Sequence, residues 1–286
     1  MKMVGKNIKE PVYLGLIGFP AFHSLSPRMH KKALKLLNIN GEYLAFEIPP
    51  ERFEKAVEGA KNLGFRGLNI TLPFKERAYK ISDEIGSDEV KFIGSANTLL
   101  FETGKIKCFN TDVFGFEKAL EKKGYSIEGK KIAVIGAGGA GRAIVFSSLK
   151  NKAKKITIFN RTKNKAEKIA EDMQSLQSKT EIEIKDLKEI DIDEFDIVVN
   201  ATSLGWKDEN VLDIFQRVKM KKNQGERKLF FDTVYRKTPF LKEAEKLGYD
   251  TEDGKWMLVL QGAKSFEIWL GIYPPEEDML KEIENI

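Results

Sequence analysis

Ile132-Ala-Val-Ile-Gly-Ala-Gly-Gly-Ala-Gly-Arg142 is the stretch that decides the fold of this chain. A short apolar run ends at Ile135, Gly136-x-Gly138-x-x-Gly141 follows, and a helical pattern continues from there. This order of strand, tight turn and helix is typical of a dinucleotide site, where the helix N-terminus binds the pyrophosphate. A glycine-rich turn with a purely structural role is the alternative. The predicted cofactor contacts are Gly136, Ala137, Gly138, Gly139, Ala140 and Gly141.

The next predicted strand, Lys155–Phe159, indicates which dinucleotide is bound. A site that prefers NAD places an acidic residue near this strand end for the ribose 2′-hydroxyl, and none is present here. Asn160, Arg161 and Thr162 follow instead, and a guanidinium can pair with a 2′-phosphate and stack on adenine. We therefore predict NADP(H), with Lys165 as a further contact. The alternative is that these cations only decorate a solvated helix start, where they oppose the helix dipole.

Composition limits the class of protein. A chain of 286 residues suits two domains, and 42% hydrophobic with 32% charged residues is typical of a folded globular protein. The net charge of +5 is spread along the chain, so we expect no nucleic-acid partner. Cys108 is the only cysteine, which excludes an intrachain disulfide and suits a reducing compartment. No signal-like or membrane-length apolar run is present, so we expect a cytoplasmic protein with no membrane partner.

Strand and helix signals alternate before the glycine-rich stretch, which predicts a mostly parallel sheet covered by helices. We expect strands at Val12–Ile17, Glu42–Ile48 and Gly67–Thr71, a hairpin of Ala96–Phe101 with Lys105–Phe109, and helices at Ser26–Leu37 and Glu51–Leu63. Ser26 is predicted as the N-cap of its helix, with Pro27 at the first helical position.

The second half predicts a dinucleotide-binding unit of parallel strands. The expected strands are Lys131–Ile135, Lys155–Phe159, Glu181–Ile184, Ile197–Asn200 and Leu229–Asp232; the expected helices are Val113–Lys123, one after Pro239, Met257–Leu270 and Glu276–Ile283. Lys219–Lys228 is predicted to be a polar surface loop. The predicted fold class is α/β in two domains with a cleft between them. Residues 1–111 form a substrate-binding domain, 112–253 a Rossmann NADP-binding domain, and 254–286 helices that return to the first domain.

Hydride transfer needs a partner group that moves a proton. His23 and His30 are the only histidines, and no cluster has zinc-ligand spacing, so we expect no metal. Lys75 and Asp112 each follow a predicted strand end. A lysine desolvated beside Phe74 is a competent proton acceptor, and a nearby carboxylate works against that. We therefore assign Asp112 to orienting the lysine and substrate hydroxyls and keep Lys75 as the provisional base. An ordinary surface salt bridge is the alternative.

Several motifs in order resemble the shikimate dehydrogenase family over nearly the whole chain. They are Ser24-Leu25-Ser26-Pro27-x-x-His30, Asn69-Ile70-Thr71-x-Pro73-Phe74-Lys75, Ala96-Asn97-Thr98, Asn110-Thr111-Asp112, Gly136–Gly141 with Asn160-Arg161-Thr162, Asn200-Ala201-Thr202-Ser203-Leu204-Gly205, and Met257-Leu258-Val259-x-Gln261-Gly262-Ala263. Lys31 and Trp206 depart from the family's usual residues, and Trp206 puts the wall of the nicotinamide pocket in doubt.

The resemblance implies roles for individual residues. Lys75 and Asp112 are implied as catalytic. The implied substrate-binding residues are Ser24, Ser26, Asn69, Thr71, Asn97, Tyr235 and Gln261; the further implied cofactor contacts are Ala201, Thr202, Val234, Gly254 and Met257. Short neutral polar side chains suit a substrate with three hydroxyls and a carboxylate, whereas Gln261 bonded only to backbone in a core is the alternative.

The resemblance also implies an activity, which is the reversible NADPH-dependent reduction of 3-dehydroshikimate to shikimate in aromatic amino-acid biosynthesis. A dehydrogenase that uses both quinate and shikimate is one alternative. A non-catalytic NADP-binding protein is another, and it predicts the loss of Lys75 or Asp112, although both are present. The oligomeric state is left open between monomer and homodimer.

Overall fold

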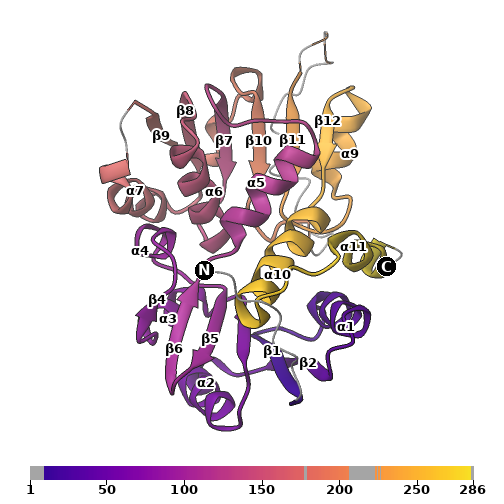
Figure 1. The fold of residues 1–286 in the computed structure, drawn as a ribbon. Coiled ribbons are helices and arrows are strands. Elements are labelled where there is room, and N and C mark those ends of the chain that lie inside the picture. The colour runs from indigo at the N-terminus through magenta and orange to yellow at the C-terminus, as the bar shows by residue number, and fades with distance from the viewer. Residues whose placement is uncertain (1–9, 177–178, 206–222, 224, 226, 285–286) are drawn as a thin grey trace. The chain divides into compact units, whose positions relative to one another are not determined.

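The computed structural model of the chain describes residues 10–176, 179–205, 223, 225 and 227–284. It divides into two compact units, one made of the described residues up to Gly115 together with Leu258 onward, and the other of Phe116–Met257 (Figure 1). The junctions lie inside helices α5 (Asp112–Lys122) and α10 (Lys255–Leu270). The sequence-based boundaries, after residues 111 and 253, stand four residues earlier at each junction.

The first unit contains a six-stranded sheet of order β2-β1-β3-β5-β6-β4. Its strands are β1 (Val12–Gly18), β2 (Gly41–Glu47), β3 (Gly67–Ile70), β4 (Glu84–Ile85), β5 (Thr98–Glu102) and β6 (Lys105–Phe109). The β1–β2, β1–β3 and β4–β6 pairs are parallel, whereas β5 runs antiparallel to β3 and to β6. The predicted hairpin is therefore confirmed, and its turn places Thr103 and Gly104 at positive φ of 51° and 76°.

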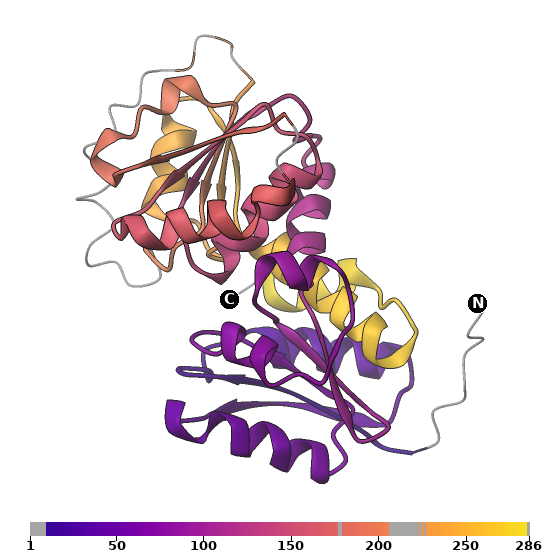
Figure 2. The same ribbon diagram turned by 90° about the vertical axis from the view of Figure 1, so that its left-hand side faces the viewer.

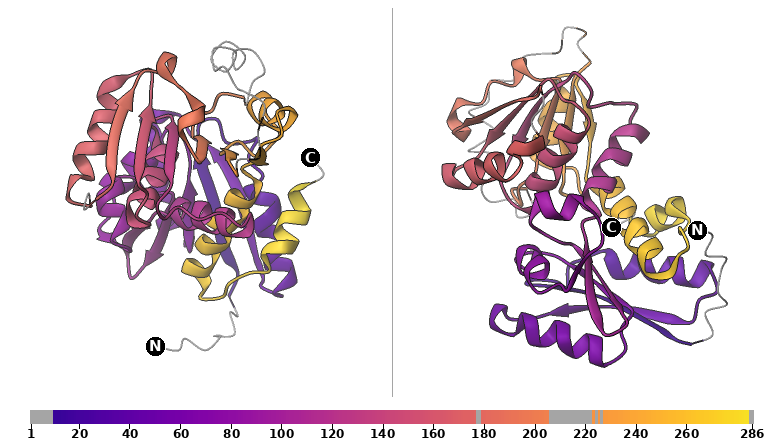
Figure 3. Two further views of the ribbon diagram at one scale, coloured as in Figure 1. Left: turned by 90° about the horizontal axis from the view of Figure 1, so that it is seen from above. Right: turned by 60° about the vertical axis from the view of Figure 1, so that its left-hand side comes forward.

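The helices of the first unit pack on this sheet and on each other. They are α1 (Ser26–Leu36), α2 (Phe53–Asn62) after the 3-10 turn Pro50–Arg52, α3 (Lys75–Lys80), α4 (Glu89–Ile93), the first turn of α5, most of α10, and α11 (Glu276–Glu284). In Figures 1 and 3 α11 lies beside α1, and an ion pair joins Lys32 to Glu282. Helix α10 lies against the sheet because the Trp269 indole N–H donates to the Leu99 carbonyl at 2.8 Å.

The structure corrects some local predictions for this unit. Ser26 is not the N-cap of α1; Leu25 occupies that position without a side-chain cap, and Ser26 begins the helix. The Ser24 hydroxyl accepts the Ser26 backbone N–H at 3.2 Å in the turn before the helix. The short elements α3, α4 and β4 were not predicted because two to six residues carry too little periodicity.

The second unit contains a six-stranded, fully parallel sheet of order β12-β11-β10-β7-β8-β9. The strands are β7 (Lys131–Ile135), β8 (Lys155–Phe159), β9 (Glu181–Lys185), β10 (Ile197–Asn200), β11 (Leu229–Asp232) and β12 (Asp250–Glu252). Strand order therefore reverses at β7, and ligands of such sheets bind at the carboxyl ends of the strands beside this switch point. The predicted parallel strands are confirmed, and only the polar edge strand β12 was missed.

Helices cover both faces of the second sheet, as Figure 2 shows. Among the described residues they are α5 from Phe116 onward, α6 (Gly139–Lys150), α7 (Lys163–Asp172) and α9 (Pro239–Lys246), with 3-10 turns at Gln174–Leu176, Leu187–Glu189 and Ile192–Glu194. Phe240, Leu241 and Ala244 of α9 pack with Val198 and Phe230 of the sheet. Val, Ile and Phe fill these strands because both faces of a parallel sheet are buried.

Two of the sequence-based predictions concern residues that lie wholly or partly outside the described ranges. Trp206 and most of the expected loop Lys219–Lys228 lie outside the described residues. Among the helices that the model describes, none is both long and apolar enough to cross a membrane.

Candidate active site

Lys75 and Asp112 meet at the carboxyl side of the first sheet. Strand β3 ends at Ile70, and Phe74 anchors the following turn by stacking on Phe53 with ring centroids 4.5 Å apart. Lys75 is then the first residue of α3, and Asp112 the first residue of α5. Lys75 Nζ lies 2.6 Å from Asp112 Oδ2, and the two side chains are only 16% and 8% exposed. The pair is therefore largely withdrawn from water, unlike an ordinary surface salt bridge.

Two amide side chains hydrogen-bond Asp112, one at its carboxylate and one at its backbone N–H. Asn97 Nδ2 donates to Asp112 Oδ1 at 2.9 Å, and the Asp112 backbone N–H donates to Asn110 Oδ1 at 3.1 Å. Asn110 is itself anchored, because its Nδ2 donates to the Ser95 carbonyl at 2.9 Å. Oδ1 is thus occupied by protein, and Oδ2 is the oxygen that faces Lys75.

A cluster of buried hydroxyl groups is hydrogen-bonded to the same network. Ser265 of α10 is fully buried, and its Oγ lies 2.7 Å from Thr98 Oγ1 and 3.1 Å from Thr111 Oγ1. It also accepts from Asn69 Nδ2 at 3.0 Å and donates to the Gln261 carbonyl at 3.0 Å. Sequence reasoning missed Ser265. The available signal was its spacing of four residues from Gln261, which places both on one helix face.

Gln261 is part of the same network. Its Oε1 accepts from Asn97 Nδ2 at 3.2 Å and from Thr111 Oγ1 at 3.4 Å, while its Nε2 donates to the Leu258 carbonyl at 2.8 Å. The alternative of a core glutamine bonded only to backbone is therefore wrong.

Asn69 is also bonded to Tyr43, which sequence reasoning missed. The Tyr43 hydroxyl donates to Asn69 Oδ1 at 2.8 Å. Complete burial raises the pKa of Tyr43 well above its usual value, so the hydroxyl remains a donor. His30 stacks on the Tyr43 ring with centroids 4.3 Å apart, and burial lowers the pKa of His30 to about 3. His30 is therefore a neutral packing residue.

The structure joins some of the predicted substrate-binding residues in one hydrogen-bonded network and leaves others outside it. Asn69, Asn97, Gln261, Lys75 and Asp112 share one hydrogen-bonded network, whereas Ser24 and Ser26 are bonded to each other at the start of α1. Thr71 is held by backbone bonds to Ile17 and Phe74 in the turn before Lys75, and its methyl group covers Gly18. Tyr235 belongs to the other unit, where it follows β11 and burial raises its pKa to about 12.

The glycine-rich turn of the second unit has the geometry expected for each glycine. Gly136 has φ of +110° and donates its N–H to the Phe159 carbonyl at 2.8 Å. A Cβ on Gly141 would lie 2.2 Å from the Gly136 carbonyl oxygen, so only glycine allows this helix–strand packing. A Cβ on Gly138 would meet no protein atom within 4 Å. The space over Gly138 is therefore open to a ligand.

The N-terminus of α6 suits an anion. Gly138 is the N-cap, no side chain caps the helix, and no acidic residue lies in its first turn. The first backbone N–H groups of a helix have no intrahelical partner, so this end presents donors and a partial positive charge. These features fit the pyrophosphate of a dinucleotide.

Asn160 connects this turn to the predicted phosphate-binding cations. Its Oδ1 accepts the Ala137 N–H at 3.2 Å, and its Nδ2 donates to the Thr162 carbonyl at 2.7 Å. Arg161 and Lys165 are exposed on either side of Thr162, the N-cap of α7. Neither cation pairs with a carboxylate among the residues described by the model. Their charges are thus available to a 2′-phosphate.

The remaining predicted cofactor contacts follow β10 and β11 or precede α10. Ala201 donates its N–H to the Ile135 carbonyl, and the Thr202 methyl would contact a Cβ on Gly136 at 2.7 Å. Gly254 donates its N–H to the Val234 carbonyl at 3.0 Å. Met257 is buried in the first turn of α10. No group of three or more metal-ligating side chains occurs in the described ranges.

Three family models match successive parts of the chain. They are the shikimate dehydrogenase substrate binding domain at residues 16–99, shikimate / quinate 5-dehydrogenase at residues 117–234, and the shikimate 5′-dehydrogenase C-terminal domain at residues 254–284.

Individual relatives match almost end to end. A shikimate dehydrogenase (NADP(+)) of Methanopyrus kandleri is 41% identical, with 96% of this chain and 95% of that protein covered. The crystal structure of Aquifex aeolicus shikimate dehydrogenase superposes with a TM-score of 0.86 at 37% identity, covering 96% of this chain and 98% of that one. A Thermus thermophilus enzyme in complex with NADP(H) and shikimate gives a TM-score of 0.80 at 33% identity, covering 95% and 98%. The family resemblance and the two-domain α/β fold are thereby confirmed, and the chain belongs to the shikimate dehydrogenase family.

Proposed function

We propose that this protein is an NADP-dependent shikimate dehydrogenase that interconverts 3-dehydroshikimate and shikimate in the pathway to the aromatic amino acids. The observation that carries the proposal is the withdrawn Lys75–Asp112 pair with its carboxylate oriented by Asn97, in a chain of this family. Family relatives named for this activity span nearly the whole chain, which supports the substrate class.

The reduction adds a hydride to the ketone carbon and a proton to its oxygen. Bound NADPH supplies the hydride. Lys75, held as an ammonium group 2.6 Å from the Asp112 carboxylate, donates the proton to the oxygen as its charge develops. In the reverse direction neutral Lys75 accepts the hydroxyl proton, and Asp112 stabilises the ammonium that forms.

The substrate's hydroxyls and carboxylate are recognised by short polar side chains of the first unit. The proposed contacts are Ser24, Ser26, Asn69, Thr71, Asn97 and Gln261, with Tyr235 contributed by the second unit. Asn69 is as constrained as Asn97, because its Nδ2, like that of Asn97, already has three protein acceptors for two hydrogens. We propose that it acts chiefly by fixing Ser265 and Thr98.

The cofactor binds the second unit in this proposal. The pyrophosphate is held by backbone N–H groups from Gly136 to Gly141 at the α6 N-terminus, and the 2′-phosphate by Arg161, Thr162 and Lys165. Asn160 holds these two segments together through its bonds to Ala137 and Thr162. Ala201, Thr202, Val234, Gly254 and Met257 are the proposed contacts for the remainder of the cofactor.

One assay tests the proposal: the rate of cofactor reduction with shikimate or quinate, each supplied with NADP⁺ or NAD⁺. Turnover of shikimate with NADP⁺ is expected to give the largest kcat/KM. A comparable value with quinate would favour the dual-substrate alternative, which the family description shikimate / quinate 5-dehydrogenase makes the natural second candidate. Cofactor binding without turnover of either acid would overturn the proposal in favour of a non-catalytic NADP-binding protein.

A further inference from the structure

Asp232, the last residue of β11, is a fully buried carboxylate that the proposed mechanism does not use. It forms no ion pair with any lysine or arginine in the described part of the chain. Burying a charge without a cation is costly unless hydrogen bonds replace its hydration. The identity of its hydrogen-bond donors therefore indicates what the charge is for.

Three donors converge on this carboxylate, two from the β11–α9 connection and one from the end of β10. The Val234 backbone N–H reaches Oδ1 at 2.9 Å, and Oδ2 accepts from Asn200 Nδ2 at 3.0 Å and from Thr238 Oγ1 at 2.7 Å. Asn200 ends β10, Val234 lies in the loop after β11, and Thr238 is the N-cap of α9. One side chain thus fixes both loops that leave β10 and β11 at the carboxyl edge of the sheet.

Asn200, the donor from β10, extends this hydrogen-bonded arrangement to Thr202. With its Nδ2 directed at Asp232, Asn200 presents Oδ1 to Thr202, accepting the Thr202 N–H at 3.1 Å and its hydroxyl at 2.7 Å. Thr202 Oγ1 then accepts the Leu204 N–H at 3.1 Å. Thr202 also packs over Gly136, the first glycine of the pyrophosphate turn. Asp232 is therefore two hydrogen bonds away from that turn.

Only an ionised carboxylate satisfies this arrangement. The three groups that hydrogen-bond Asp232 all donate to it, and an ionised aspartate has acceptor sites alone. An asparagine at this position keeps nearly the same shape but turns an NH₂ group toward one set of donors. Asn200 would then lose one of its two acceptors, keeping only the Leu204 carbonyl at 3.2 Å, or reverse its own amide, which removes the acceptor from Thr202.

We propose that Asp232 is a positioning residue for the dinucleotide: its carboxylate orients Asn200, and through it Thr202, together with the main chain at Val234. The inference rests on the proposed function in taking Thr202 and Val234 as cofactor contacts. Asp232 itself touches neither cofactor nor substrate in this proposal.

The raised pKa of Asp232 also supports the proposed positioning role of its carboxylate. Burial raises the pKa of Asp232 to about 6, against the lowering effect of its three donors, and the negative charge of Asp253 adds to the rise. Asn200, Thr238 and the Val234 main chain carry no charge. Protonation would place a donor among donors, so cofactor affinity is expected to fall as the pH drops through about 6.

The test measures Kd for NADPH and NADH with Asp232→Asn, using the full chain at pH 7.5. We expect at least a tenfold higher Kd for both cofactors, with KM for shikimate within twofold of wild type. NADH is included because it lacks the 2′-phosphate, which titrates in the same pH range. An unchanged Kd in a folded variant overturns the inference while leaving the proposed function intact.

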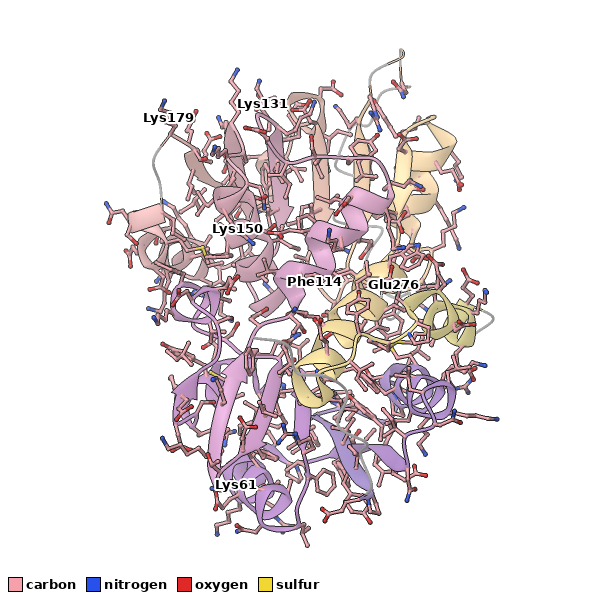
Figure 4. The ribbon with its side chains drawn as sticks, in the orientation of Figure 1. Lys61, Phe114, Lys131, Lys150, Lys179 and Glu276 are labelled. Atoms are coloured by element: carbon pink, nitrogen blue, oxygen red, sulfur yellow. The ribbon has the colours of Figure 1, made fainter. Side chains whose placement is uncertain are left out.

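Asp196→Asn is the matched control. Asp196 precedes β10 at the opposite edge of the sheet, where it accepts the Lys131 N–H at 2.8 Å and lies 3.6 Å from Lys130 Nζ. Figure 4 labels Lys131 at this edge. The control loses the same charge and is expected to keep its cofactor affinity. An equal loss in both variants would mean a general effect of charge or stability and would also overturn the inference.

If Asp232→Asn does not fold, the wild-type protein still tests the idea. Its Kd for NADH between pH 7.5 and 5.5 is expected to rise at least threefold, with a midpoint near pH 6. A flat profile overturns the inference. Wild-type protein that binds neither cofactor would overturn the proposed function and this inference together.

Discussion

Asn97 donates its side-chain amide to Asp112 Oδ1 at 2.9 Å, so that the carboxylate meets Lys75 through Oδ2. The same amide group accepts the Thr111 N–H at 2.8 Å through Oδ1 and donates to Gln261. Asn97 therefore links the ion pair to a residue of α10 that is remote in sequence. Disturbing any part of this network is expected to change turnover more than it changes stability.

Lys75→Ala is expected to lower kcat by roughly 10² to 10⁴-fold, the range for losing a positioned acid–base group. Steady-state kinetics with shikimate and NADP⁺ measures this. Lys80→Ala is the control, because Lys80 is an exposed lysine at the end of the same helix. Unchanged turnover in Lys75→Ala removes this lysine from the mechanism.

Ser265→Ala leaves Asn69, Thr98 and Thr111 without their shared partner. Each of the three keeps another hydrogen-bond partner, so the loss is that of one buried hydrogen bond, about 0.5–1.5 kcal/mol, and kcat should fall about twofold to tenfold when this loss reaches Asp112.

The control for Ser265 is Ser148→Ala. Ser148 is equally buried and also donates to the carbonyl four residues earlier, at 2.8 Å, but it lies in α6. Thermal unfolding should register both variants, while kcat should fall only for Ser265→Ala. Equal kcat values would reduce Ser265 to a structural role.

Arg161→Asp is expected to shift the ratio of kcat/KM for NADP⁺ over NAD⁺ toward NAD⁺ by at least tenfold. The new carboxylate repels a 2′-phosphate and can accept from a ribose 2′-hydroxyl. Lys179→Asp, an equal charge reversal at an exposed lysine beyond α7 (labelled in Figure 4), is the control. A parent protein that uses both cofactors equally well would contradict the 2′-phosphate assignment.

Gly138→Ala and Gly141→Ala separate cofactor binding from folding. The new Cβ of Gly138→Ala enters open space, so the variant should fold and bind NADPH at least tenfold more weakly. That of Gly141→Ala lies 2.2 Å from a backbone oxygen, and overpacking of this kind costs about 1–3 kcal/mol of stability. Calorimetric titration and thermal unfolding measure the two effects. Normal NADPH affinity in Gly138→Ala would show that the pyrophosphate lies elsewhere.

The burial of His30 predicts a loss of stability in acid. Its pKa is 6.5 when unfolded and about 3 in the folded protein, so the unfolded state binds the extra proton between these values. The contribution of His30 to the free energy of unfolding is complete above pH 6.5. It declines as the pH falls toward 3, by about 1.4 kcal/mol per pH unit at most.

Asp232 opposes this trend, because its raised folded pKa makes the native state the better proton acceptor between about 6 and 3.8. The effect of His30 is therefore isolated by the difference in the free energy of unfolding between wild type and His30→Phe, measured by urea unfolding from pH 7 to pH 4. That difference should change with pH. A constant difference would show that His30 does not titrate on unfolding.

The sequence alone predicted those features of the structure that depend only on a few neighbouring residues. Strands β7 and β8, the positive φ at Gly136 and the close packing at Gly141 follow from apolar runs and glycine spacing. Lys75 and Asp112 were selected because polar residues at strand ends gather at one edge of a sheet. The N-cap of α1 was misplaced because Ser26 satisfies the capping preference, whereas the backbone path makes Leu25 the N-cap and Ser26 the first helical residue.

The amino-acid sequence by itself determined the two α/β units, the glycine turn and the candidate ion pair, because strand, helix and turn preferences act over a few neighbouring residues. Tertiary structure alone decided that Ser265 meets Thr98 and that Asp232 accepts from Asn200 of the neighbouring strand. Ser and Asp are common residues whose hydrogen-bond partners are set by how distant elements pack, and no local pattern in the chain records that choice.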